Sequence, residues 1–236
     1  MKAMILAAGL GKRMRPLTDH TPKPLLKVAG RYLIEFHIER LVRSGIKDIV
    51  INTHWLGEQL PKALGDGTRW GVTIHYLNED VLLETAGGIQ AALSLLSDGD
   101  QSFLVVNGDV YTELNLTSWL DASPVLNEQH LAYLALVKNP DHNENGDFCF
   151  DAETLKLSLI GENELAYTYS GIALFHPALF NNVTAGPSPL GPLLKQYIEK
   201  QRVLGTLISD YWLDVGTPER LAELKQRLEN KDVVEN

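Results

Sequence analysis

The chain has 236 residues, of which 44% are hydrophobic and 22% charged, and its formal net charge is -9. This composition indicates one ordinary globular protein, and its single cysteine excludes an internal disulfide. The acidic balance argues against nucleic-acid binding, and the lack of a signal sequence or of about 18 consecutive apolar residues argues against a membrane protein, so we expect a cytoplasmic protein.

Strand and helix patterns alternate through the first half of the chain. Short apolar runs predict strands, and apolar residues at helical spacing predict helices. In chain order they are a strand at 3–7, a helix at 33–42, a strand at 48–53, a helix at 56–64, a strand at 72–77, a helix at 88–96 and a strand at 102–107. This order predicts an α/β fold, a Rossmann-like, mostly parallel sheet with helices on both faces. Ligands of such sheets bind beyond the carboxyl ends of the strands.

The second half predicts a small antiparallel lobe. Its expected elements are strands at 131–137, 148–150, 155–160 and 166–175, a helix at 189–201, and strands at 203–209 and 211–214. Thr217 is the expected N-cap of a last helix, with Pro218 at its first position. We expect a single domain over 1–230, with one half at about 1–112, the lobe at about 113–217 and the last helix at about 218–230.

A glycine-rich loop follows the first predicted strand and runs Leu-Ala-Ala-Gly-Leu-Gly-Lys-Arg-Met-Arg-Pro-Leu-Thr over 6–18. Gly9 and Gly11 let backbone amides approach a phosphate closely. Three cations of the same loop are Lys12, Arg13 and Arg15. This arrangement suits a triphosphate and its departing pyrophosphate, and the alternative is a solvated basic loop.

Two familiar phosphate-binding patterns do not fit this loop. A dinucleotide-binding fingerprint needs a third glycine where Met14 stands. A Walker A loop needs serine or threonine after Lys12, where this chain has Arg13. The loop therefore predicts phosphate binding without identifying the class of nucleotide enzyme.

Aspartates stand at the ends of two apolar runs far apart in the sequence. The first run is Val-Val-Asn-Gly-Asp, ending at Asp109, and the second is Trp-Leu-Asp-Val-Gly-Thr, with Asp214 at its centre. Each alone fits a turn or a helix cap. Together they suit Mg²⁺, which takes few protein carboxylates and keeps phosphate and water ligands.

The segment 76–89 follows the third predicted strand and includes Glu79, Thr85, Gly87 and Gly88. Thr85 and the two glycines open a helix without a bulky side chain, which leaves room for a flat base. An ordinary helix start is the alternative.

Residues 5–25 resemble the signature of the sugar-1-phosphate nucleotidyltransferases, Leu-Ala-Ala-Gly-x-Gly-x-Arg-x-x-Pro-Leu-Thr followed by Pro-Lys-Pro-Leu. The resemblance implies a single Rossmann-like domain with an inserted sugar-binding lobe. It implies that Arg13 contacts the nucleotide phosphates, that Lys23 contacts the α-phosphate region, and that Asp109 and Asp214 bind Mg²⁺. The nucleotide-binding residues expected on these grounds are Gly9, Gly11, Lys12, Arg13, Lys23, Glu79, Thr85 and Gly87.

The same resemblance implies a sugar 1-phosphate substrate, contacted by Asn107, Gly146, Asp147, Glu162, Ser170 and Gly171. Two departures point to the N-acetylmuramate-1-phosphate uridylyltransferase branch, which uses UTP in peptidoglycan recycling. Glu84 stands where many members have glycine, and the lysine that usually binds the sugar phosphate is missing near Glu162.

Other identities remain open from the sequence. Within the family they are a mannose-1-phosphate guanylyltransferase and a glucose-1-phosphate uridylyl- or thymidylyltransferase. Outside it, the chain could be a nucleotide-sensing domain without turnover. The sequence leaves the choice between a monomer and a dimer open.

Overall fold

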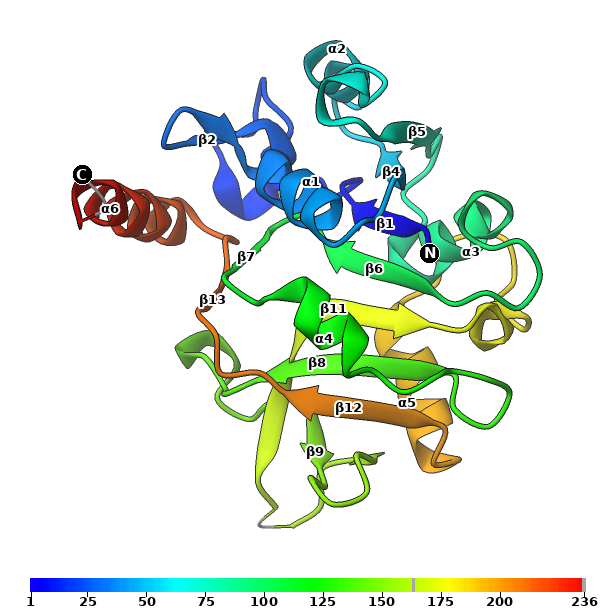
Figure 1. Cartoon of the computed structure of the whole chain (residues 1–236). Coiled ribbons are helices and arrows are strands. Elements are labelled where there is room, and N and C mark those ends of the chain that lie inside the picture. The colour runs from blue at the N-terminus through cyan, green and yellow to red at the C-terminus, as the bar shows by residue number, and fades with distance from the viewer. Residues whose placement is uncertain (163, 235–236) are drawn as a thin grey trace.

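The structure is a computed structural model that describes residues 1–162 and 164–234 (Figure 1). Within them, nine strands form one mixed sheet. Its path runs β10-β9-β11-β6-β1-β4-β5, and β8 pairs with both β11 and β12. These strands are β1 (Ala3–Leu6), β4 (Asp48–Thr53), β5 (Thr73–Asn78), β6 (Phe103–Asn107), β8 (Ala132–Val137), β9 (Phe148–Phe150), β10 (Leu157–Ser158), β11 (Ala166–Phe175) and β12 (Val203–Leu207).

The predicted α/β fold with an antiparallel part is confirmed. Strands β6, β1, β4 and β5 are parallel neighbours, as consecutive βαβ units require. Strand β11 then runs antiparallel to β6, β8 and β9, and this reversal begins the antiparallel lobe.

Helices cover both faces of the sheet. In Figure 1, α1 and α4 lie in front of it, and α3 and α5 lie behind. The six helices of the described residues are α1 (Leu33–Arg43), α2 (Gln59–Leu64), α3 (Glu84–Leu96), α4 (Leu116–Asp121), α5 (Leu190–Glu199) and α6 (Pro218–Val234). Side chains alternate between the two faces of a strand, so Ile5 packs with α1 while its neighbour Met4 packs with α3.

Left-handed backbone conformations shorten two predicted elements. The helix expected at 56–64 begins only at Gln59, because Leu56 has φ +52°. The strand expected at 155–160 is reduced to β10 at 157–158, and its start is delayed because Leu155 has φ +59°. Neither conformation continues a regular helix or strand, so hydrophobic spacing alone overextends these elements.

One helix begins earlier than predicted, and another ends later. Helix α3 begins at Glu84, four residues before the predicted start at Gly88. Helix α6 continues to Val234, beyond the expected end near 230. Its predicted cap is confirmed, since the Arg220 backbone N–H donates to the Thr217 hydroxyl at 3.4 Å.

Two short ladders outside the main sheet position the loops above it. The strand expected at 211–214 is present as β13, but neither pairing was predicted. Strand β7 (Val110–Thr112) pairs antiparallel with β13 (Trp212–Asp214), and β2 (Lys27–Val28) pairs with β3 (Arg31–Tyr32). The first ladder joins segments about a hundred residues apart in the chain. None of the helices in the described ranges has the length and apolarity that crossing a membrane needs.

Candidate active site

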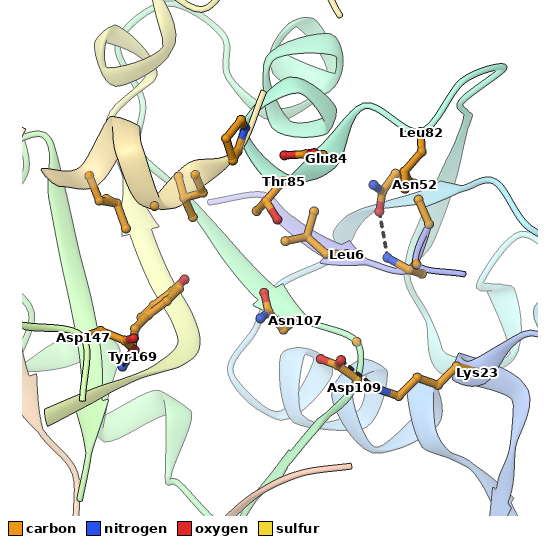
Figure 2. Close-up of a pocket in the computed structure, with 18 of the residues that line it drawn as sticks. Leu6, Lys23, Asn52, Leu82, Glu84, Thr85, Asn107, Asp109, Asp147 and Tyr169 are labelled. Atoms are coloured by element: carbon orange, nitrogen blue, oxygen red, sulfur yellow. Dashed lines mark hydrogen bonds and ion pairs between the residues drawn. The ribbon is translucent and has the colours of Figure 1, made fainter. Parts of the chain in front are cut away.

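A cavity of about 780 Å³ lies at the carboxyl ends of β1, β4 and β6 (Figure 2). Its lining comes from both halves of the chain and includes the start of α3, strand β11 and one side of α5. The residues singled out from the sequence that line it are Gly9, Lys23, Glu79, Thr85, Asn107, Asp109, Gly146 and Asp147. The position agrees with the rule that open α/β sheets bind ligands beyond their strand ends.

Lys23 and Asp109 form an ion pair in this lining. Lys23 begins the short 3-10 helix η2 (Lys23–Leu25), and its Nζ lies 2.7 Å from Asp109 Oδ2. Asp109 follows β6 by two residues, so the strand end fixes its backbone. The Lys23 side chain is 11% exposed and that of Asp109 is 36% exposed, so the carboxylate is open to a ligand that enters the cavity.

Electrostatics keep Asp109 ionised. Burial is the largest influence and raises its pKa, but the Lys23 ammonium and its hydrogen bond together lower it further, so the net pKa lies below the ordinary value. An ionised carboxylate beside a lysine suits a site that binds a metal-bound phosphate chain.

The β7–β13 ladder brings the second aspartate beside the first. Asp214 is paired with Val110, the residue after Asp109, and the Val215 N–H donates to the Asp109 carbonyl at 2.8 Å. Two strand-end aspartates that are 105 positions apart in sequence thus occupy neighbouring positions on one ladder.

Asp214 is only partly neutralised by its surroundings. Arg220 Nη1 lies 3.0 Å from Asp214 Oδ2, while Asp214 Oδ1 is buried and has no hydrogen-bond partner in the described residues. A buried carboxylate oxygen without a partner is unfavourable unless a ligand supplies one. No group of three or more metal-binding side chains occurs in the part of the chain that the structure describes. Two carboxylates with phosphate and water ligands nevertheless suit Mg²⁺, so the residues present fit that ion.

A buried hydrogen-bond chain orders the opposite side of the cavity. The Ala7 N–H donates to Asn52 Oδ1 at 2.8 Å, and Asn52 Nδ2 donates to Glu79 Oε1 at 2.7 Å. The Leu83 N–H donates to Glu79 Oε2 at 2.9 Å. A Cβ at Gly88 would lie 2.8 Å from Glu79 Oε1, so a glycine there is what allows α3 to approach.

The cations of the glycine-rich loop lie beside the cavity, outside its lining. Lys12 and Arg13 are exposed residues of the 3-10 helix η1 (Lys12–Met14). Gly11 before them has φ +60°, and a Cβ there would lie 2.9 Å from Thr18 Cγ2. The Arg13 guanidinium extends toward Asp214, because Arg13 Nη2 and Asp214 Oδ1 each lie 3.1 Å from the Cβ position of Gly216.

Of the residues expected to contact the sugar, Asn107, Gly146 and Asp147 line the cavity. Asp147 accepts hydrogen bonds from the Tyr169 N–H at 2.8 Å and from Asn143 Nδ2 at 3.2 Å, which ties the loop before β9 to β11. Gly171 has φ +82°, and a Cβ there would lie 2.7 Å from Asn107 Nδ2, so this glycine makes room for Asn107.

Besides Lys12 and Arg13, six expected site residues lie outside the cavity lining: Gly11, Gly87, Glu162, Ser170, Gly171 and Asp214. Ser170 is fully buried, and its carbonyl accepts a hydrogen bond from the Trp212 indole at 2.8 Å. The Gly87 N–H donates to the Ser188 carbonyl at 3.1 Å, so Gly87 packs against the segment before α5. Glu162 is exposed and does not line the cavity.

Sequence reasoning missed three polar residues of the lining, Asn52, Tyr169 and Lys195. Asn52 was detectable, because a polar side chain near the end of an otherwise apolar strand is unusual. Tyr169 and Lys195 lie on a strand and a helix whose patterns indicate only packing, so they needed the fold.

The comparisons with known proteins agree with this geometry. Residues 2–231 match the family model described as nucleotidyl transferase. The chain is 49% identical to the N-acetylmuramate alpha-1-phosphate uridylyltransferase of Neisseria meningitidis, over 94% of this chain and 96% of that protein. It is 30% identical to the Caulobacter vibrioides protein of the same name, over 96% of each.

A solved structure shares the fold. A Bacillus anthracis protein described as a glucose-1-phosphate thymidylyltransferase, in complex with a sucrose, superposes with a TM-score of 0.81 at 21% identity. The match covers 96% of this chain and 94% of that one.

Proposed function

The chain belongs to the nucleotidyl transferase family and is a sugar-1-phosphate nucleotidyltransferase, and from this premise we propose that it converts UTP and N-acetylmuramate α-1-phosphate into UDP-N-acetylmuramate and pyrophosphate. The observation that carries the proposal is the Lys23–Asp109 pair at the strand-end cavity, beside the ladder that holds Asp214. A place in peptidoglycan recycling and a cytoplasmic location, where UTP is available, follow as parts of the same proposal.

The reaction needs positioning and charge neutralisation more than proton transfer. The attacking oxygen belongs to a phosphate that is already anionic, so no side chain has to act as a general base. We assign Lys23 to the α-phosphate, where its ammonium offsets the charge that develops as the new bond forms. Arg13 and the amides of the glycine-rich loop bind the β- and γ-phosphates, with Lys12 as an additional cation.

Asp109 and Asp214 would hold Mg²⁺, which when bound neutralises the triphosphate and the departing pyrophosphate. The unpartnered Asp214 Oδ1 and the exposed fraction of Asp109 support this assignment. Arg220 pairs with Asp214 Oδ2, so this ion pair would have to loosen if the ion took both carboxylate oxygens.

Support for the substrate pair comes from the relatives and from the start of α3. The two bacterial proteins that match over nearly their whole length both carry the N-acetylmuramate name. Glu84 and Thr85 line the cavity where α3 begins, beside the Glu79 hydrogen-bond chain. We assign this region to the nucleotide base, and Asn107 and Asp147 to the sugar.

A substrate panel tests the proposal. Pyrophosphate release is measured with each of four nucleoside triphosphates against the 1-phosphates of N-acetylmuramate, mannose and glucose. We expect the highest kcat/KM with UTP and N-acetylmuramate α-1-phosphate. A preference for GTP with mannose 1-phosphate would replace the substrate assignment. Nucleotide binding without pyrophosphate release from any pair would favour a sensor domain and contradict the proposal.

A further inference from the structure

Lys195 places a positive charge in the cavity far along the chain from the glycine-rich loop. It lies on α5, and the cavity lining includes Leu190, Gly191, Leu194 and Lys195 of that helix. These positions recur at helical spacing, so one face of α5 forms this side of the cavity. Helix α5 packs against α3, β10 and β12, whereas η2, which bears Lys23, packs against α1. The two lysines therefore enter from different sides.

The charges around the cavity leave Lys195 without a carboxylate partner in the described residues. Lys23 and Lys195 are the cations of the lining, and Lys23 is paired with Asp109. Of the other carboxylates in the lining, those of Glu79 and Asp147 are engaged by hydrogen bonds from their own neighbours, and that of Glu84 is exposed at the start of α3. Lys195 is exposed, so its ammonium is available to an anionic group of a ligand.

The surroundings of Lys195 fit a sugar that carries a bulky substituent. Apolar side chains of the same lining are Phe148, Ile160, Pro189, Leu190 and Leu194. A Cβ at Gly191 would meet no atom within 4 Å, so the missing side chain leaves open space there. The Tyr169 hydroxyl is buried and has no hydrogen-bond partner in the described residues, and Figure 2 shows this side chain extending into the cavity. Apolar surface, space, a free hydroxyl and a cation thus occur together.

We infer that Lys195 is a specificity-determining residue that binds the carboxylate of the sugar substrate. The inference rests on the proposed function. N-acetylmuramate differs from N-acetylglucosamine by a lactyl ether at C3, which adds one methyl group and one carboxylate. The 1-phosphate has to lie near Lys23 to react, and C3 is separated from C1 by one ring carbon. A cation that enters the cavity from α5, on another side than Lys23, can therefore bind the C3 substituent. The lactyl methyl group packs on the apolar residues around Lys195.

The test compares two sugars that differ only by the lactyl group. Lys195→Gln, Lys195→Arg and the control Lys200→Gln are assayed with UTP and the 1-phosphate of N-acetylmuramate or N-acetylglucosamine. Lys200 follows α5 at its C-terminal end, where its ammonium lies 4.9 Å from the Tyr197 ring centroid, and it does not line the cavity.

For Lys195→Gln we expect KM for N-acetylmuramate α-1-phosphate to rise about 10- to 100-fold, the loss typical of one charge-assisted hydrogen bond. We expect kcat to stay within about threefold and Lys195→Arg to recover most of the affinity, because the charge is kept. Binding of UDP-N-acetylmuramate, measured by calorimetry, should weaken equally, while binding of UDP-N-acetylglucosamine stays unchanged.

Each contrary outcome has a distinct meaning. Equal losses with both sugars would show that Lys195 binds the 1-phosphate or supports the fold, and would overturn the inference. Unchanged KM in Lys195→Gln would overturn it while leaving the proposed function in place. A wild-type protein that does not use N-acetylmuramate α-1-phosphate would overturn both.

Discussion

The two sides of the cavity are built in different ways. The wall that we assign to the nucleotide, here called the nucleotide wall, consists of Ala7, Asn52, Glu79 and Leu83. It is a chain of buried hydrogen bonds in which these polar groups find protein partners. The wall that we assign to the sugar, here called the sugar wall, consists of Asp147, Tyr169 and Lys195. It leaves a buried hydroxyl without a partner and an ammonium without an ion pair in the described residues.

The difference concerns which groups fix the side-chain conformations of each wall, the protein's own or those of the substrate. Fully paired buried groups hold one conformation, so the nucleotide wall is ready before a ligand arrives. The unpaired groups of the sugar wall would gain their partners from the substrate, so that wall can select among sugars. We therefore expect changes on the nucleotide wall to affect stability, and changes on the sugar wall to affect substrate choice.

Asp109, where the two walls meet, should have the largest effect on activity. In Asp109→Asn the charge that would hold the metal ion is lost while the size is kept. We expect kcat/KM to fall about 100- to 1,000-fold, the loss typical for one electrostatic group of an active site. The free energy of unfolding should change by less than about 1 kcal/mol, because the Lys23–Asp109 pair is partly exposed.

Pyrophosphate release at several Mg²⁺ concentrations, together with urea denaturation, measures both quantities. Asp100→Asn, a change at an exposed aspartate outside the cavity lining, is the control and should leave both unchanged. Full Mg²⁺-dependent turnover in Asp109→Asn would show that the metal assignment is wrong.

Asn52→Ala tests whether the nucleotide wall is preorganised. The substitution leaves the Ala7 N–H and one Glu79 oxygen without their partners in a buried setting. We expect the free energy of unfolding to fall by about 2–3 kcal/mol, the cost of unsatisfied buried groups. KM for the triphosphate should rise more than KM for the sugar phosphate.

Asn78→Ala on the neighbouring strand is the matched control, since Asn78 is exposed and its hydrogen bond to Thr53 is long at 3.5 Å. If Asn52→Ala is as stable as Asn78→Ala, the hydrogen-bond chain does not order the wall and the contrast between the two walls fails.

The fold of the side that we assign to the nucleotide was largely predictable from the sequence, because its constraints are local. Strand ends and glycines stand at fixed spacings there, and the four parallel strands were predicted to within one residue at each end. Gly9 and Asp109 were chosen because each stands just after a strand, where a phosphate or its metal ion would bind. Lys23 was chosen from the resemblance of residues 5–25 to the family signature. The exception is Asn52, whose partners lie 45 and 27 residues away in the chain.

The sugar side was less predictable because its order comes from long-range pairing. The β7–β13 ladder joins segments about a hundred residues apart, and no local pattern indicates that it exists. Left-handed residues such as Leu155 delay the start of elements that hydrophobic spacing would begin earlier. Lys195 belongs to an ordinary amphipathic helix, and only the packing of α5 beside the cavity distinguishes its lysine from a solvent-exposed one.

His37, buried on α1 close to Asp109, gives the smallest of the three effects and depends on pH. Burial, with a contribution from Arg40, lowers the pKa of His37 to about 3. The unfolded chain binds a proton at this histidine below about pH 6.5, while the folded protein does not, so stability is full above that pH and falls as the pH drops. The slope is about 1.4 kcal/mol per pH unit, or about 2 kcal/mol lost at pH 5. Urea denaturation at several pH values above 5 should show this slope in the wild type and lose it in His37→Leu. An equal slope in both proteins would mean that other groups control the pH dependence and that the packing around the Asp109 strand end tolerates a charged histidine.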